Sequence, residues 1–380
     1  MRTVGVEEEY LLVDDEGVPA AVAPVALAIG GDPVPLGGIK ELPGETDAGD
    51  RAAEGSAGGD LEAELKQQQL ETSTPPCHDL ETLAAELREG RARAGRAAGR
   101  AGAHAVALAT SPLPFDSTVT PDRRYRRMSA LFGLTAREQL TCGCHVHVAV
   151  DSPDEGVVAL DRIGVWLPVL LALSANSPFW HGEESHYASY RHQVWNRWPS
   201  SGPTQPFGSA SAYREAVDAL VATGALLDEG MVYFDARLSA RYPTVEIRVA
   251  DVCLDLEDAV LVAALARALV ETAVNGALDG APAPDVRTEL RRAAAWRASR
   301  SGVRAELLSP TTFRPVPAAE AVAELVAHTR DALDAAGDLE RVTARLERVL
   351  SEGTGADTQR RWRAEGLEGL VEKAALRTLA

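Results

Sequence analysis

The sequence contains few lysines, few cysteines and no excess of positive charge. Its only lysines are Lys40, Lys66 and Lys373, and its formal net charge is −18 at pH 7. We therefore expect neither a nucleic-acid nor a membrane partner, because anionic surfaces of both kinds attract basic proteins. Four cysteines in 380 residues are too few for a disulfide framework.

Long apolar runs are also missing. The most apolar segments are 165–175, which contains Pro168, and 259–274, which contains Arg267 and Glu271. Neither reaches the roughly 20 apolar residues that span a bilayer. The first residues lead into carboxylates instead of the apolar stretch that is typical of a signal peptide. A cytoplasmic protein is therefore expected.

Three glycine motifs are absent from the sequence. It has no GxxxxGK[ST], no GxGxxG and no GxSxG. If the protein uses ATP, metal ions and arginines must hold the phosphates, because no glycine-rich loop is available for this task.

The order of the expected elements indicates an α+β fold. Hydrophobic residues make up 46% of the chain and charged residues 25%, which is ordinary for a globular protein. Strands are expected up to Val13, around Glu71, and at 104–110, 142–150, 231–237 and 244–250. Helices are expected at 79–102, 157–174, 209–224, 255–278, 285–300, 317–335, 338–350 and 358–378. This pattern predicts an antiparallel sheet with helices packed on one side and a helical last third.

Residues 30–60 differ from the rest of the chain. They are rich in Gly, Asp, Glu and Pro and show almost no apolar periodicity, so we expect a flexible insertion. No other segment resembles a linker. The interpretation is one domain over residues 1–380.

The segment Gly5-Val6-Glu7-Glu8-Glu9-Tyr10 is the most informative part of the sequence. In a strand, Glu7 and Glu9 face one way and Glu8 faces the other. Two carboxylates on one face repel each other unless a cation lies between them, and Mg²⁺ or Mn²⁺ prefers oxygen ligands. The alternative is a solvated acidic edge strand.

Two further segments carry candidate metal ligands. Glu71 is expected on a strand that ends at Pro75, with Glu64 just before it, although either carboxylate is also an ordinary surface residue. His145 and His147 share one face of a strand, an arrangement that suits a metal site or two core histidines. The spacing of Cys142 and Cys144 disfavours a structural zinc site.

Arginines and aromatic residues provide the remaining candidates. Glu246 and Arg248 face the same way on a strand, either as an in-sheet ion pair or as a metal ligand beside a phosphate-binding arginine. The segment 187–199 mixes aromatic residues with Arg and His. It either lines a pocket for a small polar substrate or forms a packed helix with polar tips.

Together these segments resemble the YbdK-type carboxylate–amine ligases, also called the glutamate–cysteine ligase type 2 family. The matching stretches are GVEEEYLLVD at 5–14, ELKQQQLETSTPP at 64–76, CGCHVHVAV at 142–150, SPFWHGEESHYASYRHQVWNRWPSSGP at 177–203, PTVEIRVAD at 243–251, AWRASRSGV at 295–303 and GTGADTQRR at 353–361. They follow the order of the family and reach nearly both ends of the chain.

The resemblance implies a fold of the glutamine synthetase–guanido kinase type, with an antiparallel sheet that forms a cradle for ATP and divalent ions. It implies Mg²⁺ or Mn²⁺ as cofactor and amide formation, through an acyl phosphate, between a carboxylate such as the γ-carboxylate of glutamate and an amine such as that of cysteine. A homodimer is a further expectation.

The resemblance also assigns roles to individual residues. The implied metal ligands are Glu7, Glu9, Glu71, His145 and Glu246, with Glu64 as a weaker candidate. Arg248 and Glu246 are the implied catalytic residues. Phosphate or nucleotide contacts are expected from Arg248, His147, Arg297, Arg300 and Arg360, and substrate contacts from Arg191, Tyr187 and Trp195.

Two other functions remain open at the level of the sequence. A metal-dependent hydrolase would use His145, His147 and nearby carboxylates to activate water, and it would need no nucleotide. A non-catalytic protein would keep the fold without binding Mg-nucleotide.

Overall fold

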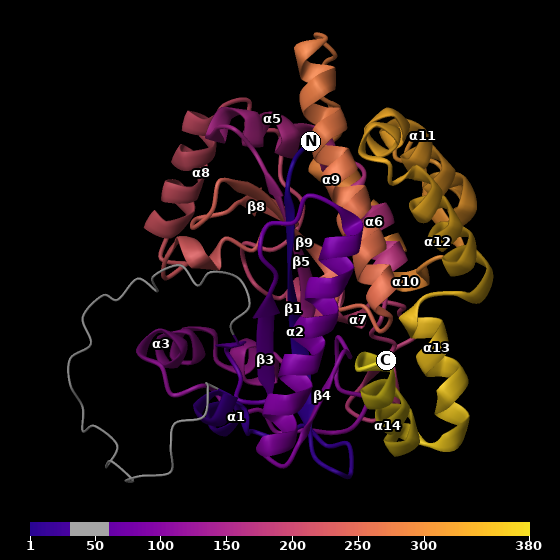
Figure 1. Cartoon of the computed structure of the whole chain (residues 1–380). Helices are drawn as coiled ribbons and strands as arrows, with labels where there is room; N and C mark the ends of the chain where they lie inside the picture. Colours follow the sequence, from indigo (N-terminus) through magenta and orange to yellow (C-terminus); the bar gives the residue numbers. More distant parts are fainter. Residues whose placement is uncertain (31–60) are drawn as a thin grey trace.

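An antiparallel sheet forms the centre of the protein (Figure 1). The computed structural model describes residues 1–30 and 61–380, and all statements on the structure refer to these residues. The strand order is β2-β3-β1-β5-β9-β8, and β4 pairs with the end of β1. The strands are β1 (Val4–Val13), β2 (Leu61–Ala63), β3 (Gln69–Ser73), β4 (His104–Val106), β5 (Gly143–Ala149), β8 (Ala236–Leu238) and β9 (Thr244–Asp251).

Helices cover one face of this sheet. Helix α9 packs on β1, β5 and β9, while α2 packs on β1 and β3, and α5 and α6 pack on β9. In the view of Figure 1, α2 and α9 cross in front of the strands. The helices are α1 (Ala23–Gly30), α2 (Leu80–Arg100), α3 (Arg123–Phe132), α4 (Leu134–Glu138), α5 (Pro153–Ile163), α6 (Leu167–Ser174), α7 (Tyr190–Trp195), α8 (Ala210–Ala222), α9 (Leu256–Leu278), α10 (Thr288–Ser301), α11 (Ala318–Ala336), α12 (Leu339–Glu352), α13 (Gly355–Trp362) and α14 (Leu367–Thr378). The expected α+β arrangement is confirmed.

The alternation along the strands separates a core face from a polar face. Val146 and Val148 of β5 and Val245 and Ile247 of β9 lie in the core with α9. His145 and His147 therefore point to the opposite face, as the sequence predicts.

Helix α9 is the core helix of the protein. Its length and composition would allow it to cross a membrane, but 78% of its most apolar window is buried inside the protein. Helices α5 and α6 would together also be long and apolar enough to cross a membrane if this bent pair were counted as one span. The burial of α9 agrees with the expectation that it is not a membrane span.

Several predicted boundaries are wrong. The helix predicted at 157–174 is divided into α5 and α6, which meet at 73°, because Pro168 has no N–H to continue the helical hydrogen bonds. The helix predicted at 358–378 is divided before Gly366, whose φ of +93° is left-handed. The strand predicted at 104–110 ends at Val106, and the strand predicted at 231–237 begins only at Ala236 after a 3₁₀ turn.

The sequence predicts a purely helical last third, and this prediction is wrong, because a hairpin of β10 (Glu306–Leu308) and β11 (Pro315–Pro317) separates α10 from α11. A second hairpin lies earlier in the chain, where β6 (Phe179–Trp180) pairs with β7 (Glu183–Glu184) before α7. Both are too short for a two-residue periodicity to be read from the sequence. The insertion expected at 30–60 lies outside the described residues except for Gly30, which ends α1.

A buried ion pair fixes β1 to α2 on the core face. Glu8 is 0% exposed and Arg91 is 2% exposed. Arg91 donates to both carboxylate oxygens of Glu8, at 2.6 and 2.9 Å, and also to the carbonyl oxygens of Cys253 and Leu254 at 2.7 and 3.2 Å. The hydroxyl of Tyr10 donates to Glu8 at 2.8 Å. The carboxylate is thus fully hydrogen-bonded, which a buried charge requires.

We expect Arg91→Met to destabilise the protein by about 3–5 kcal/mol, because it leaves the carboxylate of Glu8 buried without its partner. Urea unfolding of the variant and the parent measures this loss. The control is Arg96→Met on the same helix, which removes an exposed pair with Glu89 and should leave stability unchanged. Equal midpoints for both variants would contradict the structural role of the buried pair.

Candidate active site

The polar face of the sheet collects ionisable side chains from four neighbouring strands. The register places Glu7 opposite His145 and places Glu9 opposite Glu71. It also places His147 opposite Glu246. The ionisable residues on this face are Glu7 and Glu9 on β1, Glu71 on β3, His145 and His147 on β5, and Glu246 and Arg248 on β9.

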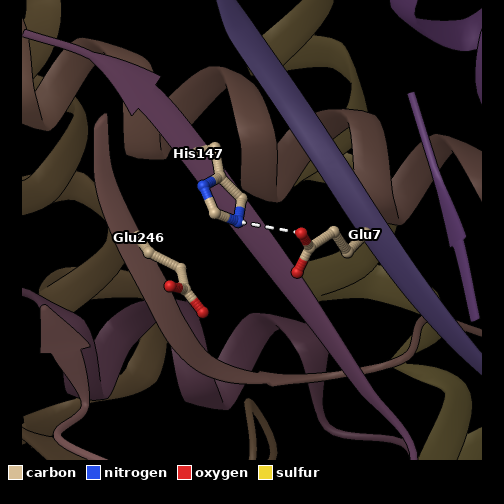
Figure 2. Close-up of side chains that lie close together, drawn as sticks. All are labelled: Glu7, His147 and Glu246. Atoms are coloured by element: carbon tan, nitrogen blue, oxygen red, sulfur yellow. Dashed lines mark ion pairs between the residues drawn. The ribbon is translucent and has the colours of Figure 1, made fainter. Parts of the chain in front are cut away.

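Three overlapping groups of these side chains have the spacing of metal ligands. They are Glu7–His147–Glu246, Glu7–Glu71–His145 and Glu9–Glu64–Glu71, and in each group one ligand atom of every residue lies within 4.8 Å of the others. Figure 2 shows the first group, with Glu7, His147 and Glu246 pointing toward one another from three strands. The ring nitrogen His147 Nε2 lies 3.3 Å from Glu7 Oε1.

The donor atoms fit a divalent cation. The set is rich in carboxylate oxygen, which Mg²⁺ and Mn²⁺ prefer, and imidazole nitrogen binds divalent first-row transition-metal ions. His145 Nε2 and His147 Nε2 are buried, and their nearest carboxylate oxygens, Glu9 Oε1 at 3.8 Å and Glu7 Oε1 at 3.3 Å, do not meet the geometry of a hydrogen bond. Such unpaired buried atoms are expected where a ligand completes the site.

The pKa values show how strongly the carboxylates interact. Burial, followed by the charge of Glu64, raises the pKa of Glu9 to about 7. Burial and the charges of Glu7 and Glu64 raise the pKa of Glu71 well above its usual value. Without a cation these groups resist ionisation, so a bound cation would stabilise their charged forms.

The histidines and the remaining carboxylates behave differently. Burial and the charge of Arg248 lower the pKa of His145 to about 4, so its ring is neutral near pH 7 and able to bind a metal. Burial raises the pKa of Glu7, but hydrogen bonds to His145 and His147 outweigh this effect and leave the pKa well below its usual value. For Glu246 the charges of Arg248 and Arg237 likewise outweigh burial and lower the pKa.

Glu246 is shared between two arginines. Arg248 contacts one carboxylate oxygen, and Arg237 of β8 donates to both oxygens at 2.7 and 3.0 Å. The in-sheet ion pair considered for Glu246 and Arg248 is therefore present, and Glu246 also belongs to a candidate metal group. Arg248 lies over the rings of Trp195 and Tyr233, at 5.7 and 6.0 Å from their centroids, which fixes its position.

These groups line a cavity of about 700 Å³. The lining also includes the aromatic and apolar side chains of Tyr125, Met128, Trp195, Trp198 and Tyr233. The rim includes Arg124 of α3, which pairs with Asp228 at 2.7 and 2.8 Å. The cavity is large enough for a nucleotide or several small substrates.

Several lining residues were not identified from the sequence. Arg237, Tyr125, Met128 and Tyr233 lie on segments whose register or distance in space the sequence does not show. Arg237 could be placed opposite Glu246 only if the pairing of β8 with β9 were already known.

The structure places other candidates outside the cavity lining. Arg297 donates to Glu306, Arg300 lies over the ring of Tyr187, and Arg360 donates to Glu184 and to the carbonyl of Tyr187. Trp195 lines the cavity, whereas Arg191 is buried next to Trp195. Within the segment 187–199, residues 190–195 form the packed helix α7, while Trp195 and Trp198 line the cavity, so each alternative holds in part.

The fold is shared with ligases of known structure. A glutamate–cysteine ligase from Francisella tularensis, solved in complex with AMP, matches with a TM-score of 0.66 and 13% identity, over 100% of this chain and 89% of that one. A bifunctional glutathione synthetase from Pasteurella multocida matches with a TM-score of 0.63 and 15% identity, over 99% of this chain and 52% of that one. At such identities the likeness establishes the fold: a mixed α+β ligase fold with an antiparallel sheet.

Sequence relatives establish the family. The model of "Glutamate-cysteine ligase family 2 (GCS2)" matches residues 3–375. The Streptomyces coelicolor protein named "Putative glutamate–cysteine ligase 2" is 50% identical over 384 residues, which cover 100% of both chains. A Streptomyces avermitilis relative, "Putative glutamate–cysteine ligase 2-1", is 50% identical over 362 residues, or 95% of this chain and 94% of that one. The chain belongs to glutamate–cysteine ligase family 2, and it is a glutamate–cysteine ligase-like, ATP-dependent carboxylate–amine ligase.

We expect the affinity for Mn²⁺ to increase with pH between about pH 6 and about pH 8, because a carboxylate must lose its proton to bind a metal. Glu9, with a pKa of about 7, is protonated below this value and ionised above it. Calorimetric titration with Mn²⁺ at several pH values measures the effect. An affinity that does not change with pH would contradict the participation of Glu9.

Glu7→Gln should weaken Mn²⁺ binding by at least about tenfold, since Glu7 belongs to two of the three candidate groups. Electron paramagnetic resonance of free Mn²⁺ gives the bound fraction. The matched control is Glu183→Gln, an exposed carboxylate on β7, which should bind Mn²⁺ like the parent. Equal binding by both variants would remove Glu7 from the site.

Proposed function

We propose that the protein joins the γ-carboxylate of glutamate to an amine such as that of cysteine, with ATP converted to ADP and phosphate. One observation carries this proposal: four strands bring carboxylates, two histidines and Arg248 together on one side of a single cavity. The family and the fold support the same chemistry. We also propose that the sheet is a cradle of the glutamine synthetase–guanido kinase type.

Activation of the carboxylate is the first step in this proposal. A carboxylate is a poor electrophile, so one of its oxygens attacks the γ-phosphorus of ATP, and ADP leaves. Arg248 supplies a fixed positive charge where negative charge develops on the transferred group, and Trp195 and Tyr233 hold it in place. His147 would face the phosphate from the neighbouring strand.

The cation has a supporting role. Mg²⁺ or Mn²⁺, held by Glu7, Glu9, Glu71, His145 and Glu246 with a weaker contribution from Glu64, would neutralise charge on the β- and γ-phosphates. The protein positions these ligands on a hydrogen-bonded sheet, so little reorganisation is needed when the substrates bind.

Amide formation completes the reaction. The amine nitrogen attacks the carbonyl carbon of the acyl phosphate, the amine loses a proton, and inorganic phosphate leaves with the former carboxylate oxygen. The aromatic side chains of Trp195 and Tyr233, which line the cavity next to Arg248, suit an amine substrate with an uncharged side chain, for example one that carries a thiol. The positive charge of Arg191, next to Trp195, would favour the carboxylate substrate.

The hydrolase alternative is not favoured. It rested on two histidines and nearby carboxylates, and the chain belongs to a family of ATP-dependent ligases. The non-catalytic alternative is weakened by the presence of all the acidic and histidine elements in one cavity.

The proposal is tested by mixing the protein with MgATP and glutamate and offering cysteine within a panel of other amines. Release of ADP that depends on the amine, together with an amide of the matching mass, is the expected result. If no carboxylate–amine pair yields ADP and the protein does not bind MgATP, the proposed function is wrong.

Glu246→Gln should reduce ADP release by at least about a hundredfold, because it removes a candidate metal ligand and leaves Arg237 and Arg248 without their shared carboxylate. Steady-state kinetics measures the loss, and near-ultraviolet circular dichroism confirms that the variant is folded. Full activity in a folded variant would exclude Glu246 from the reaction.

A further inference from the structure

The guanidinium of Arg191 is buried beside the cavity and only weakly bonded. Arg191 is 2% exposed, and its Nε has no hydrogen-bond partner among the described residues. Its terminal nitrogens reach only the carbonyl oxygens of Arg248 and Val249, both at 3.5 Å, which is beyond the usual length of a hydrogen bond. Since these hydrogen bonds fix the head group poorly, its position depends on the backbone of Arg191 together with the contact to the ring of Trp195, whose centroid lies 5.6 Å away.

The backbone of Arg191 is attached to a buried carboxylate through a serine. The hydroxyl of Ser177 accepts a hydrogen bond from the N–H of Arg191 at 2.9 Å and donates to Asp251 Oδ2 at 2.7 Å. Asp251 also accepts from the hydroxyl of Ser189 at 2.8 Å and from the N–H of Asn176 at 2.8 Å. Asp251 is the last residue of β9, so this network ties the start of α7 to the sheet that carries the site.

The C-terminal segment belongs to the same network. Gln359 of α13 is 1% exposed and donates to the carbonyl oxygen and to Oδ1 of Asn176, at 2.8 and 2.6 Å. A Cβ at Gly355 would lie 2.2 Å from Asn176 Oδ1, so only glycine lets α13 approach this closely. The GTGADTQRR segment, which resembles the family motif, therefore contacts the loop before α7 and not the cavity.

The guanidinium of Arg191 lies against Gly143 of β5. A Cβ at Gly143 would be 2.3 Å from Arg191 Nη2, so the guanidinium occupies the space that a side chain at position 143 would fill. The N–H of Gly143 donates to Glu9, and Arg191 is therefore close to the acidic cluster. A small displacement of α7 would move this positive charge away from Gly143 and from Trp195.

We infer that Ser177, Asp251 and Gln359 are positioning residues that hold the guanidinium of Arg191 beside the cavity, next to Gly143 and Trp195. This inference rests on the proposed function, in which the charge of Arg191 favours the carboxylate substrate. It assigns a task to the C-terminal segment that the catalytic chemistry leaves without one.

A pair of serine variants tests the inference. Ser177→Ala and Ser189→Ala each remove one fully buried hydroxyl that donates to Asp251, but only Ser177→Ala also releases the N–H of Arg191. We expect Ser177→Ala to raise the KM for the carboxylate substrate about tenfold, with kcat and the KM for MgATP little changed. Ser189→Ala should change the same KM by less than about twofold, while its melting temperature falls by about as much as that of Ser177→Ala.

A double-mutant cycle separates positioning from general destabilisation. In an Arg191→Met background, Ser177→Ala should have no further effect on the KM for the carboxylate, because there is no guanidinium left to position. An undiminished effect in this background, or equal KM values for the two serine variants, would overturn the inference.

A crystal structure of Ser177→Ala supplies a readout that is independent of activity. The guanidinium should be displaced from its place beside Gly143 and Trp195, and an unchanged position would overturn the inference. If the parent protein yields no ADP with any pair and does not bind MgATP, the proposed function is wrong, and the structure of the variant still decides whether Ser177 positions Arg191.

Discussion

The arrangement of the site depends on the buried ion pair between Glu8 and Arg91. A strand presents alternate side chains to opposite faces, so the face chosen by Glu8 determines the face of Glu7 and Glu9. Arg91 binds the Glu8 carboxylate bidentately and is itself bonded to the carbonyls of Cys253 and Leu254. A shift of β1 by one residue would bring Glu7 and Glu9 against the apolar core, where no second arginine is available to them among the described contacts. The pair therefore specifies the register that makes the acidic cluster possible.

The cluster itself is an unfavourable arrangement that the rest of the fold stabilises. Burial, together with the charge of Glu64, raises the pKa values of Glu9 and Glu71, whereas the charges of Arg248 and Arg237 hold Glu246 ionised. Carboxylates in such proximity persist because the antiparallel register fixes their backbones, and a cation would relieve the repulsion. Arg191 has no direct ion pair within the described residues. Its guanidinium is positioned by the backbone hydrogen bond to Ser177 and by the ring of Trp195.

Much of this arrangement could be predicted from the sequence, and the reasons for the exceptions are physical. Two-residue alternation placed Glu7 and Glu9 opposite Glu8 and grouped His145 with His147, because strand periodicity is a local property. Arg237 and Tyr233 were missed because their approach to Glu246 and Arg248 depends on the pairing of β8 with β9, which is non-local. Arg297, Arg300 and Arg360 are expected at the phosphates only because of a resemblance; in the structure Arg297 and Arg360 donate to Glu306 and Glu184, and Arg300 lies over the ring of Tyr187. The division of the helix predicted at 157–174 follows from Pro168, which lies within an otherwise helical pattern.

The transfer of isotopic oxygen tests the central claim most directly. Glutamate labelled with ¹⁸O in its γ-carboxylate is incubated with the protein, MgATP and the amine that supports turnover, and the inorganic phosphate is analysed by mass spectrometry. If the carboxylate attacks the γ-phosphorus and phosphate later leaves from the acyl carbon, each phosphate released carries one labelled oxygen. Amide formation with unlabelled phosphate would contradict activation through an acyl phosphate, and label found in AMP instead would show that the carboxylate attacks the α-phosphorus.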